Sequence, residues 1–117
     1  MPQKYIGSCH CGAVAFETEL DTASCITCNC SMCGRAGTVL SFVPENAFHL
    51  QKGADELTDY LFHKEHIHHV FCQTCGIKPF AYAKGENGET TYAVNLRCLE
   101  NLDIDSLTPQ KVDGKSY

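Results

Sequence analysis

Apolar and polar residues alternate along much of this chain, with short apolar runs separated by polar or glycine-containing stretches. The clearest alternation covers residues 12–20. Its apolar or small residues share one face of an extended segment and are Val14, Phe16, Thr18 and Leu20. A period of two is typical of a strand that is buried on one face. The pattern therefore predicts a strand over 12–20.

Other segments have the same character. The segments that predict further strands are 38–44, 47–50 and 65–72, and 57–64 fits either a strand or a helical turn. Residues 78–84 and 89–96 flank the turn sequence GENG at 85–88 and predict a β-hairpin. Pro79 indicates that the first hairpin strand is an edge strand or begins after a bulge.

The C-terminal part of the chain does not predict further strands. Residues 97–107 predict one short helix, and 108–117 predict a polar tail. Many short strands at regular spacing favour an all-β fold, and neither a repeat nor a linker divides the chain. We therefore expect a single all-β domain over residues 1–117 with at most one short helix.

Composition narrows the classes of function. Hydrophobic residues make up 44% and charged residues 20%, as in folded globular chains. The net charge is −5 and no two Lys or Arg residues are adjacent, which argues against a nucleic-acid partner. No apolar stretch is long enough to span a membrane. The N-terminal sequence lacks the apolar run of a signal peptide, so we expect a cytoplasmic, reducing location.

The chain contains nine cysteines. An odd number in a reducing compartment favours metal binding over disulfides. Eight of them lie in closely spaced motifs, which are Cys9/Cys11, Cys25/Cys28/Cys30/Cys33 and Cys72/Cys75. Three are followed directly by glycine, at Gly12, Gly34 and Gly76, where a positive φ would allow a tight turn around a sulfur ligand. Cys72–Cys75 and Cys30–Cys33 therefore predict two zinc knuckles.

Neither short motif fills a tetrahedral site alone. Cys9 and Cys11 lie at the mouth of one predicted hairpin, and Cys72 and Cys75 lie at the mouth of another. Combined, the two pairs predict a structural Cys₄ zinc site that links distant parts of the chain.

Cys28, Cys30 and Cys33 offer three thiolates within six residues. Cys25 could close this site as a fourth ligand, which would make it a second structural zinc. The alternative is an open three-thiolate zinc, which would favour binding another thiolate over activating water. The spacing alone does not decide between a closed structural site and an open three-thiolate site.

Four motifs in order carry a family resemblance. They are GSCHCGAV at 7–14, CNCSMCGRAG at 28–37, FCQTCGIKPF at 71–80 and VNLRCL at 94–99. They resemble the glutathione-dependent formaldehyde-activating (GFA, or centromere-protein-V domain) family, and SFVP at 41–44, GADELTDY at 53–60 and VDGK at 112–115 extend the match over about 7–115.

The resemblance implies a β-tent fold of antiparallel sheets with zinc at their junctions. It implies two zinc ions per chain, a structural one on Cys9, Cys11, Cys72 and Cys75 and a catalytic one on Cys28, Cys30 and Cys33. It further implies a carbon–sulfur lyase that joins glutathione to formaldehyde as S-hydroxymethylglutathione.

Other residues have weaker roles. Arg35 could meet a carboxylate of a bound thiol peptide, although an exposed surface arginine is the simpler interpretation. The stretch HKEHIHH at 63–69 predicts surface or edge histidines, with His68 and His69 on opposite faces of a strand. His66 or His69 is an alternative proton shuttle or zinc ligand.

Two other functions compete with the lyase. Cys98 near an arginine would suit a methionine sulfoxide reductase, but a small packed side chain is the simpler role for this residue. A non-catalytic adaptor held together by saturated zinc sites is the remaining alternative. An edge strand near Pro79 would leave room for a homodimer.

Overall fold

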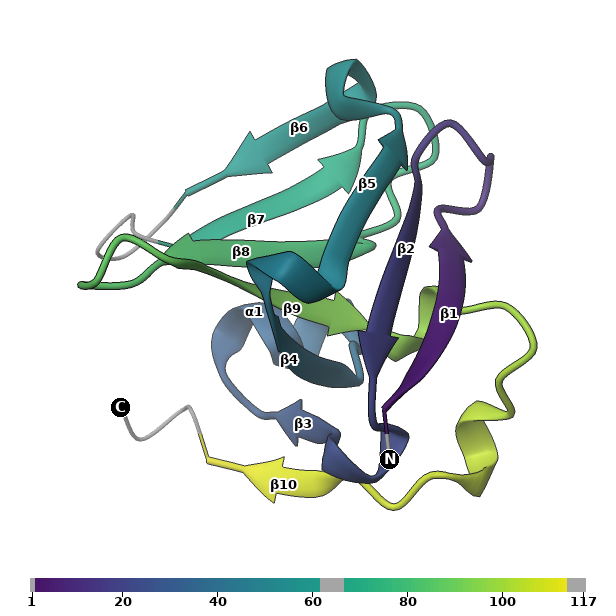
Figure 1. Ribbon diagram of the computed structural model, residues 1–117, viewed down its shortest axis with the longest axis vertical. Helices are drawn as coiled ribbons and strands as arrows, with labels where there is room; N and C mark the ends of the chain where they lie inside the picture. Colours follow the sequence, from purple (N-terminus) through teal and green to yellow (C-terminus); the bar gives the residue numbers. More distant parts are fainter. Residues whose placement is uncertain (1, 62–66, 114–117) are drawn as a thin grey trace.

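The computed structural model describes residues 2–61 and 67–113 and forms two sheets (Figure 1). The smaller sheet is antiparallel, in the order β1-β2-β5. Its strands are β1 (Gln3–Ser8), β2 (Ala15–Leu20) and β5 (Phe48–Lys52). Figure 1 shows β1 and β2 side by side at the right, with β5 beside them. Strands β6 to β9 of the other sheet extend toward the left.

The larger sheet has the order β10-β3-β4-β9-β8-β7-β6 and is antiparallel except for the parallel pair β10–β3. Its strands are β3 (Ile26–Cys28), β4 (Leu40–Pro44), β6 (Leu57–Tyr60), β7 (Ile67–Cys72), β8 (Phe80–Lys84), β9 (Thr90–Asn95) and β10 (Gln110–Val112). In the described residues the one α-helix is α1 (Ser31–Ala36). Short 3₁₀ turns cover Thr22–Ser24, Glu45–Ala47, Ala54–Glu56, Leu96–Cys98 and Ile104–Ser106. The all-β prediction with one short helix is confirmed.

The main core lies between the two sheets. Phe16 of β2 and Phe48 of β5 stack with ring centroids 5.2 Å apart, and Phe48 lies 4.7 Å from Phe80 of β8. Phe16 is 0% exposed, and burying such a side chain contributes about 1.5–3 kcal/mol. The face predicted for 12–20 is the buried one, so that expectation is confirmed, and packing across this core gives the β-tent arrangement.

The opposite face of the larger sheet carries α1. Cross-strand pairing places one row of side chains across that face, from Phe42 through Ala93, Ala81 and His69 to Tyr60. Cys33 of α1 packs against the cluster formed by Leu40, Ala81 and Ala93. Because the two alanines are short, the helix can approach the sheet closely at this point.

The hairpin over 78–96 forms as predicted, and 57–64 gives a strand over Leu57–Tyr60. The expectation that Pro79 marks an edge strand is wrong, because β8 lies between β7 and β9. The strand begins immediately after Pro79, whose carbonyl accepts a hydrogen bond from the Asn95 N–H at 3.0 Å. The room for a homodimer inferred at this position is therefore filled by a neighbouring strand of the same chain.

The predicted helix over 97–107 is also wrong. The structure has two separate 3₁₀ turns there, because the side chains of Asn95 and Asp103 each cap a new turn. The α-helix lies instead inside the cysteine-rich segment, where the Cys30 sulfur accepts a hydrogen bond from the Cys33 N–H at 3.3 Å. Gly37, with φ +68°, ends it.

The tail predicted over 108–117 contains a short strand, since β10 pairs with β3 and places Val112 opposite Cys28. The Asn29 side chain donates a hydrogen bond to Asp113 Oδ1 at 2.9 Å. Residues 114–117 lie outside the described part of the chain. None of the described helices has the length and apolar character needed to cross a membrane.

Candidate metal centres

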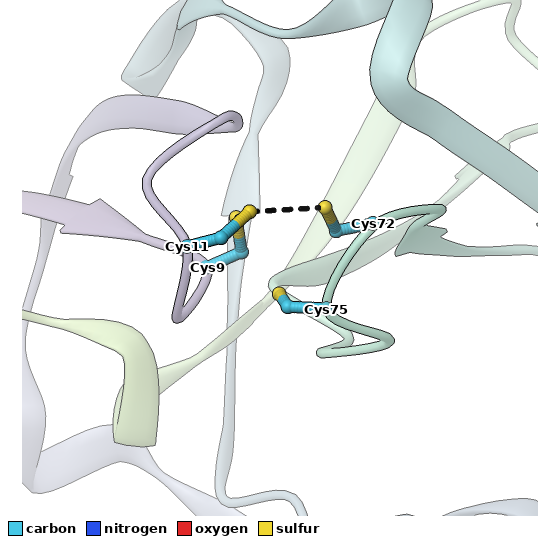
Figure 2. Close-up of side chains that lie close together, drawn as sticks. All are labelled: Cys9, Cys11, Cys72 and Cys75. Carbon is cyan, nitrogen blue, oxygen red and sulfur yellow. Dashed lines mark hydrogen bonds between the residues drawn. The ribbon is translucent and has the colours of Figure 1, made fainter.

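Four cysteine side chains converge where the two sheets meet. Cys9 and Cys11 lie in the loop after β1, Cys72 is the last residue of β7, and Cys75 lies in the following turn. Figure 2 shows all four sulfurs pointing toward one another, and they lie within 4.8 Å of one another. The structure thus brings together the residues predicted for the Cys₄ site, which we call the four-cysteine group.

The loops of the four-cysteine group are shaped by glycine and by backbone N–H groups. Gly12 (φ +82°) and Gly76 (φ +79°) adopt the expected left-handed conformation, which costs glycine little. The N–H of Val14 donates to the Cys9 sulfur at 3.3 Å, and the N–H of Thr74 donates to the Cys72 sulfur at 3.4 Å. The N–H groups of Cys75 and Thr74 lower the pKa of Cys72 and so favour its negatively charged form.

The spacing of these sulfurs fits a tetrahedral metal ion. With zinc–sulfur bonds of about 2.3 Å, the sulfurs of a tetrahedral site lie about 3.8 Å apart. The Cys9–Cys11 and Cys11–Cys72 sulfur distances are 3.7 and 3.6 Å, and all nine cysteines are free thiols. The N–H groups of Cys11 and Ile77 lower the pKa of Cys75 to about 6, which prepares it as a ligand. The donor set is therefore compatible with zinc.

A second group contains Cys28, Cys30 and Cys33, whose sulfurs also lie within 4.8 Å of one another. Cys28 ends β3, Cys30 is the N-cap of α1, and Cys33 lies within the helix. The expected knuckle with a positive φ at Gly34 is absent here, because Gly34 is helical. We call these residues the three-cysteine group.

Cys25 does not join the three-cysteine group. Its side chain is 2% exposed and packs in the core between the sheets. Among the described residues the three-cysteine group contains no fourth Cys, His, Asp or Glu ligand. The interpretation in which Cys25 closes this site is therefore not supported.

The charges of the three-cysteine group favour a bound cation. Burial and the neighbouring Cys30 raise the pKa of Cys33 to about 12. Burial opposes ionisation of Cys30 as well, but the N–H and thiol of Cys33 lower its pKa overall. Three close sulfurs share their negative charge readily only when a positive ion lies among them, and thiolates suit a soft divalent ion such as zinc.

A pocket of about 200 Å³ lies beside α1. It is lined by Met32, Ala36, Tyr60, His69, Phe71, Gly76 and Lys78. Lys78 Nζ lies 2.8 Å from His69 Nδ1. Burial and the Lys78 charge lower the pKa of His69 to about 4, so its ring is neutral at pH 7 and accepts from the lysine ammonium.

The expectation of surface or edge histidines is wrong for His69, which is 8% exposed. Its Lys78 partner was missed by sequence reasoning, because the register of β7 and β8 that brings the two residues together is not visible in either motif. His68 lies on the opposite face, as predicted, where its Nδ1 forms a hydrogen bond with Asp59 Oδ2 and its ring stacks on Tyr82. His66 lies outside the described residues.

The remaining predicted residues have simpler surroundings. Arg35 is exposed, and its Nη1 donates to the Ser31 carbonyl at 3.0 Å. Cys98 packs against the main core, and burial, together with Cys9 and Cys75, raises its pKa to about 11. A thiol that stays protonated at neutral pH is a poor nucleophile, which argues against the reductase alternative.

Comparison with known proteins finds a family model and a solved structure that match most of this chain. The family model described as glutathione-dependent formaldehyde-activating enzyme matches residues 4–113. Among solved structures, the crystal structure of a Rhodobacter sphaeroides protein from a structural genomics programme is 33% identical in sequence, with a TM-score of 0.80. That match covers 91% of this chain and 97% of the other.

Proposed function

This chain belongs to the glutathione-dependent formaldehyde-activating enzyme family, and from that premise we propose that it is a zinc-dependent enzyme of the carbon–sulfur lyase type. It adds a small thiol such as glutathione to an aldehyde such as formaldehyde, and it catalyses the reverse release. The observation that carries the proposal is the three-cysteine group, which has no fourth protein ligand among the described residues and lies next to a pocket.

The two groups of cysteines have different roles in this proposal. Cys9, Cys11, Cys72 and Cys75 hold a structural zinc ion at the junction of the sheets. Cys28, Cys30 and Cys33 would hold a second zinc ion, and because they are one ligand fewer than the four-cysteine group, a substrate sulfur could complete the set. When bound there, zinc supplies a Lewis acid that favours the thiolate form of that sulfur.

The protein contributes mainly by positioning the reactants. The three-cysteine group fixes the place of the substrate sulfur beside α1, and the adjacent pocket holds the aldehyde. In the forward direction the thiolate sulfur forms a bond to the carbonyl carbon, and the carbonyl oxygen takes up a proton. Holding both reactants in place can account for much of the acceleration.

Native mass spectrometry of anaerobically purified protein, with and without glutathione, tests this proposal. We expect two zinc ions per chain, and a glutathione adduct whose formation requires the second ion. Two ions with no response to glutathione would contradict the proposal and favour the adaptor. A single tightly held ion would contradict the assignment of the second site.

We also propose that Arg35 binds a carboxylate of the thiol substrate. Because Arg35 is exposed and lies two residues after Cys33, its guanidinium can exchange its contact with the Ser31 carbonyl for one with a carboxylate. Arg35→Ala should weaken glutathione binding by about twofold to fivefold, measured by titration calorimetry. It should leave the binding of 2-mercaptoethanol, which has no carboxylate, unchanged. Equal effects on both thiols would contradict this role.

Free cysteines also bear on the compartment. None of the nine cysteines is paired in a disulfide, and seven of them belong to the two cysteine groups. Because thiolate ligands and thiol substrates persist under reducing conditions, we propose the cytoplasm as the place of action.

A further inference from the structure

The pocket beside α1 lies near the three-cysteine group, and the two are connected through α1. Met32 and Ala36 of α1 line it, and they flank Cys33 on the same short helix. Cys33 packs against the cluster that contains Ala81, and Ala81 is the cross-strand partner of His69. A molecule in the pocket would therefore lie close to a sulfur bound at the three-cysteine group.

The pocket is larger than formaldehyde requires. Its volume is about 200 Å³, whereas an apolar cavity of about 150 Å³ is enough to hold benzene. Its walls are largely apolar and include Met32, Ala36 and Phe71. Formaldehyde has no carbon substituent and would leave most of this volume unused.

One wall of the pocket carries a positive charge in a defined place. Lys78 Nζ lies 2.8 Å from His69 Nδ1. The histidine is buried, and the pairing of its strand β7 with β8 in the larger sheet fixes its position. An ammonium group has three donors, and His69 accepts from one of them. Lys78 is therefore oriented within a pocket that is otherwise suited to an apolar group.

We propose that this pocket binds the aldehyde and that Lys78 donates a hydrogen bond to the carbonyl oxygen. The substrate class is then aldehydes that carry an apolar substituent between propyl and phenyl in size. This inference rests on the proposed function and extends it to the second substrate. His69 acts as a positioning residue for Lys78.

The addition step needs no reagent other than the thiol and the aldehyde, because its bonds, electrons and protons balance. The thiolate sulfur forms a bond to the carbonyl carbon, and the π electrons of the carbonyl move to its oxygen. Lys78 hydrogen-bonds this oxygen and transfers a proton to it. The proton that the thiol lost on binding restores the Lys78 ammonium, so that a thiol and an aldehyde give a hemithioacetal with no change in redox state.

Exchange NMR of the metal-loaded protein with glutathione and either butanal or formaldehyde tests the size of the pocket. Ala36→Leu adds bulk to the pocket wall at an exposed helix end, and Ala23→Leu is the matched control at an exposed position elsewhere. Ala36→Leu should slow butanal exchange about tenfold or more and formaldehyde exchange less than about twofold. Equal slowing of both aldehydes, or of neither, would overturn the assignment.

Binding of butanamide gives a readout that does not depend on turnover, because its carbonyl does not react with thiols. Ligand-observed NMR should detect binding to the native protein, weakened about tenfold or more by Lys78→Met and unchanged by Lys84→Met, which alters an exposed lysine of β8. Butanamide binding that depends on Lys78, without acceleration of any aldehyde, would refute the proposed function but support the pocket. Formaldehyde turnover without butanamide binding would refute the pocket alone.

Discussion

Replacement of Cys72 by serine should leave a chain that does not fold cooperatively at neutral pH. Cys72 is 0% exposed and ends β7, and its sulfur lies 3.6 Å from that of Cys11 in the other part of the fold. Zinc in a structural site contributes about 10–16 kcal/mol in apparent binding free energy, whereas small domains are stable by only about 5–15 kcal/mol. Losing one of the four ligands would therefore remove most of the free energy of unfolding.

Far-UV circular dichroism during heating, together with a zinc count, measures this effect. Cys98→Ser is the matched control, because Cys98 is a partly buried thiol outside both cysteine groups. It should fold with two zinc ions and lose about 1–2 kcal/mol at most. A Cys72→Ser protein that melts cooperatively with both ions bound would show that the four-cysteine group is not a structural zinc site.

Replacement of Cys30 by serine should abolish thiol-dependent activity and leave the fold intact. Cys30 caps α1 through its sulfur, and serine is among the best N-cap residues, so the helix should keep its cap. Serine does not replace thiolate as a ligand for a soft metal ion. We expect one zinc ion per chain and a fall in enzymatic exchange of about 100-fold or more.

Exchange NMR with glutathione and formaldehyde measures the activity, and a thermal melt checks the fold. Cys98→Ser again provides a control, with exchange close to the unsubstituted protein. Loss of folding in Cys30→Ser would make the three-cysteine group structural. Retained exchange would place the chemistry elsewhere.

The sequence predicted those parts of the fold that repeat a local pattern over many residues. Alternation in 12–20 gave the buried face of β2, and the GENG turn gave the β8–β9 hairpin. The pairing of Cys9/Cys11 with Cys72/Cys75 followed from ligand number, since two ligands cannot fill a tetrahedral site. The structure brings these four sulfurs together.

Features that depend on partners far apart in the chain were not visible in the sequence. β3 and β10 have three residues each, which is too short for a periodic pattern, and each is stabilised by the other. The prediction for Pro79 used only the missing N–H of proline. The position of β8 in the sheet is set instead by its neighbours β7 and β9. The Lys78–His69 contact likewise depends on strand register, and no motif contains both residues.

The sequence distance closed by the four-cysteine group has a consequence during synthesis. Cys11 and Cys72 are 61 residues apart, and a ribosome adds about 5–20 residues per second, so the first pair of thiols waits about 3–12 s for the second. During that interval the nascent chain carries unmatched thiols, and strands β8 and β9, which lie inside the larger sheet, have not yet been made. The metal ion can complete the junction only after the chain has emerged past Cys75, and β10 closes the larger sheet later still.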